Sequence, residues 1–505
     1  MIEPTSKKSS NVIWRALGFV LVLAQTISSV LLIISLLNTN VLNSTILIIV
    51  AIILISLLII CATKLFIQKS PSTSARIICA IISIICIAAS IFALRYTDAI
   101  NGFLNKITEQ KPETKEYSVM VLDSSETGKI ESLENKSIGF IKTDPKSANA
   151  EQYLQNVISF EADFYDDLDV LISALETSIT DGIVLESDRL DAINENEEDA
   201  LKDTRIIYTF EIELESENIE ISDKEITTEP FIVYISGSDS RTGIKTTARS
   251  DVNIIAVVNP KVGKILLVSI PRDTYVQLNG TVGLKDKLTH AGIYGINMSK
   301  TTIEDFLGIK IDHTIKVGFE AVVKVVDELD GIDIYSDQAM KLKAANTNNQ
   351  KTCEYIVGKQ HVDGDCALRF ARERKSYERG DRHRGENQEQ VIASIIERLT
   401  SSKDYLLKAP SILDAAADLF ETTFEREDIT SFIRLQLTNP ISWQVESIAI
   451  DGAGSMQPTY SMGANRPLYV MIPNQESINN AVNKIHQYLA EEPVDPEEKE
   501  SDSNE

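Results

Sequence analysis

The chain has little positive charge and lacks the short motifs that mark common nucleotide and zinc enzymes. Lys and Arg number 49 against 74 Asp and Glu, which gives a formal net charge of −25 at pH 7. Nucleic-acid-binding surfaces are usually basic, so this acidic excess argues against a nucleic-acid partner. No Walker loop, no G-x-G-x-x-G and no H-E-x-x-H occurs, and the five histidines show no ligand spacing.

Cysteine is also scarce, and its positions divide into two groups. Cys61, Cys79 and Cys86 lie in apolar runs, where cysteine behaves as a small buried hydrophobe. Cys353 and Cys366 lie in the polar part of the chain, and no C-x-x-C or His/Cys zinc spacing is present. If that part is outside the cell, the two could form a disulfide, and otherwise they are free thiols.

Three long apolar runs stand near the N-terminus. Residues 16–37, 46–63 and 77–94 contain no charged side chain and are rich in Leu, Ile and Val. Each has the length needed to cross about 30 Å of hydrocarbon. The first run is too long for a cleaved signal peptide. The alternative is a set of buried helices in a soluble protein, but three such runs together favour a multi-pass membrane protein.

The flanking cations predict the orientation of these spans. Three Lys or Arg residues precede the first run and three lie between the second and third, whereas the loop 38–45 has none. Cytoplasmic loops carry the excess of Lys and Arg. Residues 1–15 are therefore predicted to be cytoplasmic, residues 16–95 to form three spans, and the rest to lie outside the cell. Arg95 is a mild exception.

The predicted outer part divides into several segments. Short buried-strand patterns alternate with helical patterns, which indicates α/β structure. A nearly apolar-free acidic tail follows and is expected to be disordered. The predicted segments are an accessory domain at 111–220, a catalytic domain at 228–400, a C-terminal completion of the outer domain at 401–490, and the tail at 491–505.

Charged residues stand at the ends of several predicted strands of the second α/β segment. They occur in GSDSR at 237–241, ARSD at 248–251 and SIPRD at 269–273. Open α/β sheets bind ligands beyond the carboxyl ends of their strands. Asp239 and Asp251 could hold a Mg²⁺ shared with phosphate oxygens, since Mg²⁺ takes one or two protein carboxylates and completes its shell with water and phosphate.

Six arginines lie between 369 and 384, in the run LRFARERKSYERGDRHR. Arginine presents a planar, permanently charged fork that binds phosphate oxygens in pairs. If the segment is extended, Arg372 and Arg374 share one face, and Arg384 and Gln388 share one face of the helix that follows. The alternative is a solvated surface in which Glu373 and its neighbours pair with the arginines. The side chains predicted to surround a diphosphate are Arg249, Arg272, Arg372, Arg374, Arg384 and Gln388.

With these motifs in place, residues 231–399 resemble the catalytic domain of the LytR-CpsA-Psr family. The resemblance rests on GSDSR, ARSD, NPKVGKILLVSIPRDTYV, DKLTHAGIYG, RFARER and GDRHRGENQEQVI, in that order. Three spans followed by an accessory module are most similar to the streptococcal-type capsule members. The resemblance implies an α/β catalytic domain with a central mixed sheet flanked by helices.

The resemblance also implies an activity. Members of the family are phosphotransferases outside the membrane, which attach a glycopolymer from a polyprenyl diphosphate carrier to peptidoglycan through a phosphodiester. It implies Asp239 and Asp251 as Mg²⁺ ligands and the arginine set with Gln388 as the diphosphate site. Further site residues in matching motifs are Arg241, Lys287 and Asp273, with Asp251, Asp273 and Arg272 expected to be catalytic. Asn387 stands where the family commonly has Arg.

Other functions are compatible with the same residues. The site could hydrolyse the carrier diphosphate with water as the nucleophile, or the chain could be a non-catalytic module that binds lipid-linked polymer and regulates its export. Transcriptional control conflicts with the predicted topology. The expected partners are the polyprenyl-linked glycan, taken to be a capsular polysaccharide, together with peptidoglycan, the membrane and capsule export machinery.

Overall fold

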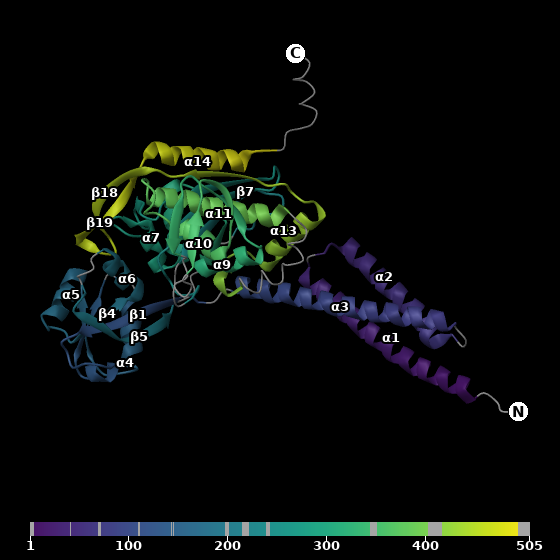
Figure 1. Cartoon of the computed structure of the whole chain (residues 1–505). Helices are drawn as coiled ribbons and strands as arrows, with labels where there is room; N and C mark the ends of the chain where they lie inside the picture. The colour runs from purple at the N-terminus through teal and green to yellow at the C-terminus, as the bar shows by residue number, and fades with distance from the viewer. Residues whose placement is uncertain are drawn as a thin grey trace, which may run out of the picture. The chain divides into compact units, whose positions relative to one another are not determined.

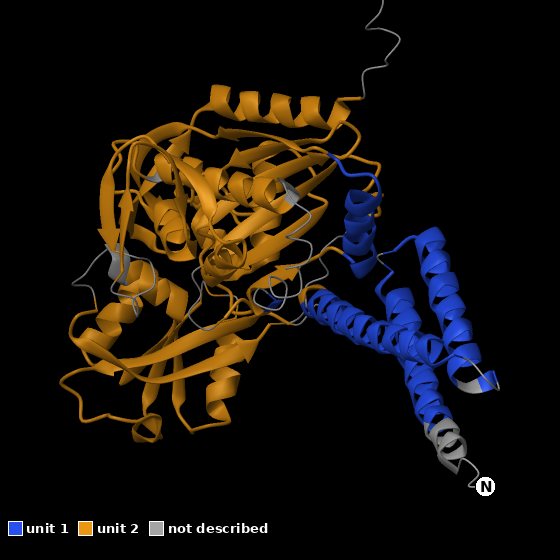
Figure 2. Ribbon diagram, turned by 45° about the vertical axis from the view of Figure 1, so that its right-hand side comes forward, with its two compact units in different colours: residues 1–106, 407–417, 425–441 blue, residues 107–406, 418–424, 442–505 orange. Residues whose placement is uncertain are grey.

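The computed structural model divides into two compact units (Figure 2). Unit 1 contains residues 1–106, 407–417 and 425–441, and unit 2 contains residues 107–406, 418–424 and 442–505. The structure describes residues 5–40, 42–68, 72–109, 112–142, 144, 146–196, 201–214, 222–238, 243–343, 351–401 and 417–492. The predicted tail at 491–505 lies almost wholly outside these residues.

Unit 1 is built from long apolar helices (Figure 1). They are α1 (Thr5–Thr39), α2 (Ser44–Ala62), continued by the π-helical turn Thr63–Ile67, and α3 (Thr73–Thr108). Each contains a segment long and apolar enough to cross a membrane. The three predicted apolar runs are therefore confirmed as helices. The third helix continues well past residue 94, where the prediction ended.

Polar side chains join α1 to α3 inside unit 1. Ser83 donates to the side-chain oxygen of Gln25 at 2.7 Å, and the hydroxyls of Ser35 and Thr97 are 2.6 Å apart. All four side chains are buried. Because lipid tails are as apolar as the helices themselves, such bonds give the helices a specific mutual register that apolar burial alone does not.

A helix from late in the chain also belongs to unit 1. This helix, α13 (Arg426–Thr438), begins with a capping box. Arg426 donates to the side chains of Asn101 and Asn105 and, at 3.2 Å, to the carbonyl oxygen of Asn38. A second arginine of α13 donates to a carbonyl oxygen just after α1. The bonds attach α13 to the C-terminal ends of α1 and α3.

The first sheet of unit 2 forms the accessory module. Its five strands have the spatial order β3-β2-β4-β1-β5, with β2 parallel to β3 and β4, and β1 antiparallel to β4 and β5. The elements are β1 (Thr114–Leu122), β2 (Ser137–Ile141), α4 (Ser147–Gln155), β3 (Glu161–Tyr165), α5 (Leu168–Glu176), β4 (Gly182–Glu186), α6 (Ser187–Asn196) and β5 (Thr204–Glu213). Successive side chains of its strands enter two apolar clusters, one on each face of the sheet.

The second sheet of unit 2 is mixed and has six strands in the order β16-β11-β6-β7-β8-β17. The pairs β6–β11 and β8–β17 are parallel, and the other neighbours are antiparallel. The strands are β6 (Phe231–Ser238), β7 (Val252–Asn259), β8 (Lys264–Ser269), β11 (His313–Gly318), β16 (Phe420–Thr422) and β17 (Gln444–Ala449). Residues after 400 therefore supply both edge strands.

Helices cover both faces of this sheet (Figure 1). Residues of α8 (Ile296–Leu307) and α14 (Gln475–Ala490) join inward-facing strand residues such as Leu266 and Val268 in one large core. Ser269 alternates with Val268, and Gly385 of α11 (Asp381–Ser401) comes close to Ser269, so α11 covers the opposite face. The predicted α/β fold with a central mixed sheet between helices is confirmed.

Further helices and strands of unit 2 surround the six-stranded sheet. They are β9 (Tyr275–Val276), β10 (Asp286–Lys287), α7 (Leu288–Ala291), α9 (Phe319–Glu328), β12 (Ile332–Ser336), β13 (Met340–Lys343), β14 (Thr352–Tyr355), β15 (Gly358–Val362), α10 (Gly364–Arg372), β18 (Gly452–Thr459) and β19 (Gly463–Pro473). The pairs β12–β15, β13–β14 and β18–β19 are antiparallel, and the sequence analysis predicted none of them.

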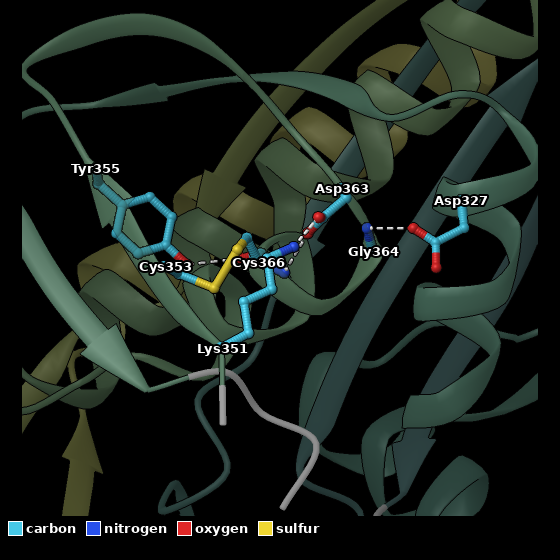
Figure 3. The surroundings of a disulfide bond; sticks show 7 residues. All are labelled: Asp327, Lys351, Cys353, Tyr355, Asp363, Gly364 and Cys366. Carbon is cyan, nitrogen blue, oxygen red and sulfur yellow. Dashed lines mark hydrogen bonds and ion pairs between the residues drawn. A yellow bond between two sulfur atoms is a disulfide. The ribbon is translucent and has the colours of Figure 1, made fainter. Parts of the chain in front are cut away.

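A disulfide joins Cys353 of β14 to Cys366 in the first turn of α10 (Figure 3). The two Cα atoms are 5.5 Å apart. Asp363 caps the same turn by accepting from the amide of Cys366 at 3.1 Å, and Tyr355 donates to the carbonyl oxygen of Cys366 at 2.7 Å. The sequence left open whether the two cysteines form a disulfide or remain free thiols, and the structure contains the disulfide. It fixes the start of the helix that ends at Arg372.

We predict that replacing both cysteines, Cys353→Ser with Cys366→Ser, lowers the free energy of unfolding by about 2 to 4 kcal/mol, because the bridge limits the unfolded chain. Urea unfolding of the full chain in detergent, followed by tryptophan fluorescence, measures this change. Cys79→Ala, at one of the free and buried cysteines, is the control for loss of a buried sulfur and should shift the midpoint much less than the double variant does. Equal midpoints for the double variant and the wild type would contradict the prediction.

Candidate functional site

The site lies where several loops meet beyond the strands of the six-stranded sheet. One loop leads into β7 and carries Arg249 and Asp251, whose amide donates to the carbonyl oxygen of Gly237 on β6 at 2.9 Å. Another loop follows β8 and carries Arg272 and Asp273. Of the residues predicted after β6, Asp239 and Arg241 lie outside the described residues, so their positions in the site stay a prediction.

Asp251 is the point at which the predicted cations meet. Its carboxylate accepts from Arg272 at 3.0 Å, and its own side chain is 17% exposed. Burial alone would raise the pKa of Asp251, but the Arg272, Arg384 and Arg249 guanidinium groups outweigh burial and lower it below its usual value. Three arginines from three separate segments are therefore close to one ionised carboxylate.

Helix α11 brings Arg384 into this group. Arg384 lies in the first turn of the helix, is buried, and reaches the carbonyl oxygen of Asp251 at 3.5 Å. Gln388 follows one turn later and is also buried, so the predicted pairing of these positions on a helix is confirmed. One residue further on, burial raises the pKa of Glu389 to about 9, although the backbone amide of Ser269 donates to it. This neutral acid attaches α11 to β8.

Asp273 and Lys287 form a second charged pair beside the site. Their charged atoms are 3.0 Å apart, and each side chain is only 9% exposed. The segment after Lys287 is bonded to both site loops, because Thr289 donates its amide to the carbonyl oxygen of Arg272 at 2.9 Å and accepts from the amide of Ser250 at 3.0 Å. Lys287 therefore lies close to the loop of Arg272.

The backbone at Arg372 is helical, so the extended arrangement considered for Arg372 and Arg374 is not present at Arg372. Arg372 is the last residue of helix α10, while Glu373 is the extended residue that ends it. The helix forms because Asp363 caps its start and apolar residues at 366–371 pack into a core. Arg372 lies over the ring of Phe319, 4.9 Å from its centroid, and Arg374 follows after the helix.

The other arginines of the run pair with acidic side chains. Arg369 pairs with Glu373, and Arg379 pairs with Glu386 at 2.6 Å. Arg382 pairs with Asp451, also at 2.6 Å. The alternative considered from the sequence, a face of arginines matched by carboxylates, therefore describes half of the run. The structure separates these three from Arg384, which lies beside Asp251.

Asn387 is buried and bonded to helix α10. Its side-chain amide donates to the carbonyl oxygen of Phe370 in α10 at 3.2 Å, and the side chain is 2% exposed. The bond joins α11 to the end of the helix that carries Arg372. The departure from the family pattern at this position thus has a structural role here.

Two residues that interact with Asp251 or Arg249 escaped the sequence analysis. The hydroxyl of Thr289 donates to the carboxylate of Asp251 at 3.4 Å, and its motif DKLTHAG was noted without a role for Thr289. Asp188, at the start of α6 in the accessory module, faces Arg249. Burial raises the pKa of Asp188 to about 7, although Arg249 lowers it. No sequence signal links residues so far apart.

The residues present fit a magnesium ion shared with phosphate. Asp251 supplies an ionised carboxylate, and Thr289 a neighbouring hydroxyl, among cations that suit phosphate. Within the described part of the chain, no three His, Cys, Asp or Glu side chains gather as a protein-only metal site. Magnesium does not require such a group, because substrate phosphate and water complete its shell.

Comparisons with known proteins identify the family of the chain. The model of the LytR_cpsA_psr family matches residues 194–483, more than half of the chain. A protein of Halalkalibacterium halodurans named polyisoprenyl-teichoic acid–peptidoglycan teichoic acid transferase TagU is 31% identical over 253 residues, 49% of this chain and 76% of that protein. The proteins of the same name from Enterococcus faecalis and Bacillus anthracis are 31% identical over 231 residues and 35% identical over 182 residues.

These matches cover different shares of the relatives. The match spans 45% of this chain and 72% of the Enterococcus faecalis protein, but 36% of this chain and only 56% of the Bacillus anthracis protein. Among solved structures, the crystal structure of TagV from B. subtilis is 28% identical with a TM-score of 0.43, over 53% of this chain and 99% of that chain. The family model matches more than half of the chain, and the relative from Halalkalibacterium halodurans is 31% identical and matched over 76% of its length. The chain therefore belongs to the LytR-CpsA-Psr family.

Proposed function

We propose that the protein is a Mg²⁺-dependent phosphotransferase that attaches a cell-wall glycopolymer from a polyprenyl diphosphate carrier to peptidoglycan through a phosphodiester. The observation that carries the proposal is the gathering of Arg249, Arg272 and Arg384 around Asp251. Family membership and the printed names of the relatives, which describe transfer of a polyisoprenyl-linked polymer to peptidoglycan, support it.

The arginines would bind the diphosphate through paired hydrogen bonds to its oxygens. Phosphoryl transfer depends mainly on position and on neutralising charge, and this cluster supplies both from fixed elements. Arg272 and Arg384 are already held close to Asp251, so little rearrangement is needed before the substrate binds. Arg372, Arg374 and Gln388 belong to the adjoining ends of α10 and α11 and would extend the same site, as would Arg241.

The two carboxylates of the site suit different tasks. Because its pKa is lowered, Asp251 stays ionised at neutral and mildly acidic pH, which favours binding of a cation and makes it a weak proton acceptor. Mg²⁺, when bound by Asp251 and Asp239, would neutralise charge that develops on the phosphate oxygens. Asp273, which is paired with one cation, Lys287, rather than with several arginines, is then the better candidate to accept the proton of the attacking sugar hydroxyl, while the carrier leaves as polyprenyl monophosphate.

The identity of the transferred polymer is a separate part of the proposal. The order of three apolar helices, an accessory module and a catalytic domain favours a capsular polysaccharide, whereas the relatives' names specify teichoic acid. Both lipid-linked donors should therefore be tested in the same assay. The full chain, purified in detergent, is mixed with donor, peptidoglycan fragments and Mg²⁺, and the linked product is detected by mass spectrometry. Free monophosphopolymer without an adduct would indicate hydrolysis instead.

Location outside the cell is also part of the proposal. The disulfide Cys353–Cys366 fits an oxidising compartment, and the cations flanking the spans favour a cytoplasmic N-terminus. The membrane, the carrier lipid and peptidoglycan are then all accessible to the catalytic domain, and export machinery for the capsule is a plausible neighbour.

We expect protease added to intact protoplasts to digest the chain after α3 while leaving an N-terminal tag protected. Immunoblots against tags at the two ends measure the result. A C-terminal tag that survives on intact protoplasts and is lost only after lysis would place the catalytic domain in the cytosol and refute the proposed topology.

Two arginines of one run provide a matched test of the site. We predict that Arg384→Ala lowers the transfer rate by about 100-fold or more, because a buried cation beside Asp251 is lost. Arg379→Ala should stay within about twofold of the wild type, because Arg379 is 56% exposed and pairs only on the surface. The rate of product formation is measured for both variants. Equal losses of rate in the two variants would contradict the assignment of Arg384 to the site.

Removal of divalent ions should stop transfer, and added Mg²⁺ should restore it. In Asp251→Asn, the Mg²⁺ concentration for half-maximal rate should rise by about tenfold or more, because one ionised ligand is lost. Titration of the rate with Mg²⁺ after chelation measures this. Full activity in excess chelator would rule out the metal, and an unchanged Mg²⁺ requirement in the variant would rule out Asp251 as a ligand.

A further inference from the structure

The accessory module is packed firmly against the catalytic domain within unit 2. Met462 and Leu468, next to and within the β18–β19 hairpin, belong to the apolar cluster formed by residues of β1, β4, α5 and α6. Beside that cluster, Arg466 of β19 pairs with Asp169 of α5. The shared core fixes the module in place, so contacts elsewhere along the same interface can act as rigid supports.

The first strand of the module reaches the loop that carries the site. At the start of β1, the amide of Thr114 donates to the carbonyl oxygen of Lys245 at 3.0 Å, and the amide of Thr247 donates to the carbonyl oxygen of Thr114 at 2.8 Å. The hydroxyls of Thr114 and Thr246 are 3.3 Å apart. These bonds fix residues 245–247, and Arg249 follows only two residues later.

A charged pair strengthens the same junction. Glu113, just before β1, binds the ammonium group of Lys316 on β11 at 2.8 Å, with side chains 19% and 7% exposed. Lys316 also reaches the carbonyl oxygen of Thr246 at 3.4 Å, so one cation joins the accessory module, the central sheet and the site loop. The other carboxylate oxygen of Glu113 accepts from the amide of Ile296 at 3.4 Å, at the start of α8.

Further along the interface, a buried charged cluster faces the catalytic domain. Lys115 pairs with Glu186 and, at 3.2 Å, with Asp144. Its ammonium group also lies over the ring of Tyr294, 5.5 Å from the centroid. Glu186 also pairs with Arg189 of α6 at 2.6 Å, so the cluster joins several elements of the module along this interface.

We propose that the accessory module is a positioning element of the catalytic site: Glu113 and Thr114 hold the segment 245–247 and so fix Arg249 and Asp251 for diphosphate binding. This inference rests on the proposed function for its chemistry. Glu113 touches neither substrate nor reacting atoms, so it is a positioning residue. Displacing a binding group by about 1 Å can cost about 100-fold in rate, so support of the loop is large enough to matter.

The test compares Glu113→Gln, Lys316→Met and the double variant in the full chain. Lys142→Gln is the matched control, because it breaks an ion pair with Asp166 on the exposed surface of the same module. Two readouts are taken: binding of farnesyl diphosphate with Mg²⁺, and kcat and KM for transfer. Thermal midpoints show whether each variant is folded.

Glu113→Gln is expected to weaken farnesyl diphosphate binding and raise KM by about tenfold, with little change in kcat or in the midpoint. The double variant should lose no more than the worse single variant, because both changes break one junction. Lys142→Gln should behave like the wild type. Glu113→Asp, which keeps the charge, should recover part of the affinity.

Two results would overturn the inference. One is unchanged affinity and KM in both Glu113→Gln and Lys316→Met. The other is a loss that merely follows the unfolded fraction, which would mean a general structural role. The binding readout also separates this inference from the proposed function: a wild type that binds the diphosphate but transfers nothing refutes the transferase, while a weaker Glu113→Gln complex still supports the positioning role.

Discussion

The attraction between Asp251 and the guanidinium groups around it is the interaction on which the functional account depends. A carboxylate this deeply placed would tend to be neutral, yet Arg272, Arg384 and Arg249 keep it ionised. The three arginines come from separate parts of the chain, so only the folded sheet brings them together. The same fixed cations that stabilise one carboxylate can stabilise the greater charge of a diphosphate.

Different contacts hold the segments that carry the cations. Arg384 depends on α11, which is attached to β8 through a buried neutral Glu389 and to α10 through Asn387. Arg272 lies in a loop tied to the segment of Thr289. Helix α10 is anchored at its start by the disulfide and by the cap of Asp363 (Figure 3). The site is therefore rigid, as electrostatic stabilisation of a transferring phosphate requires.

The sequence predicted those features that local pattern determines. Apolar runs gave the three long helices, short buried-strand patterns gave the strands, and strand-end motifs marked Asp251 and Arg272. The extended arrangement considered at Arg372 is absent, because an N-cap and apolar packing favour a helix there. The pair between Arg382 and Asp451, and the bond between Glu113 and Lys316, join residues that are distant in sequence. Such partners follow from tertiary packing, which a single sequence does not show.

The most direct measurement is a crystal structure of the protein with a polyprenyl diphosphate and Mg²⁺. The account predicts phosphate oxygens bound by Arg249, Arg272 and Arg384, with the metal between the diphosphate and Asp251. A diphosphate bound elsewhere, with Asp251 and Arg272 still paired only to each other, would contradict it.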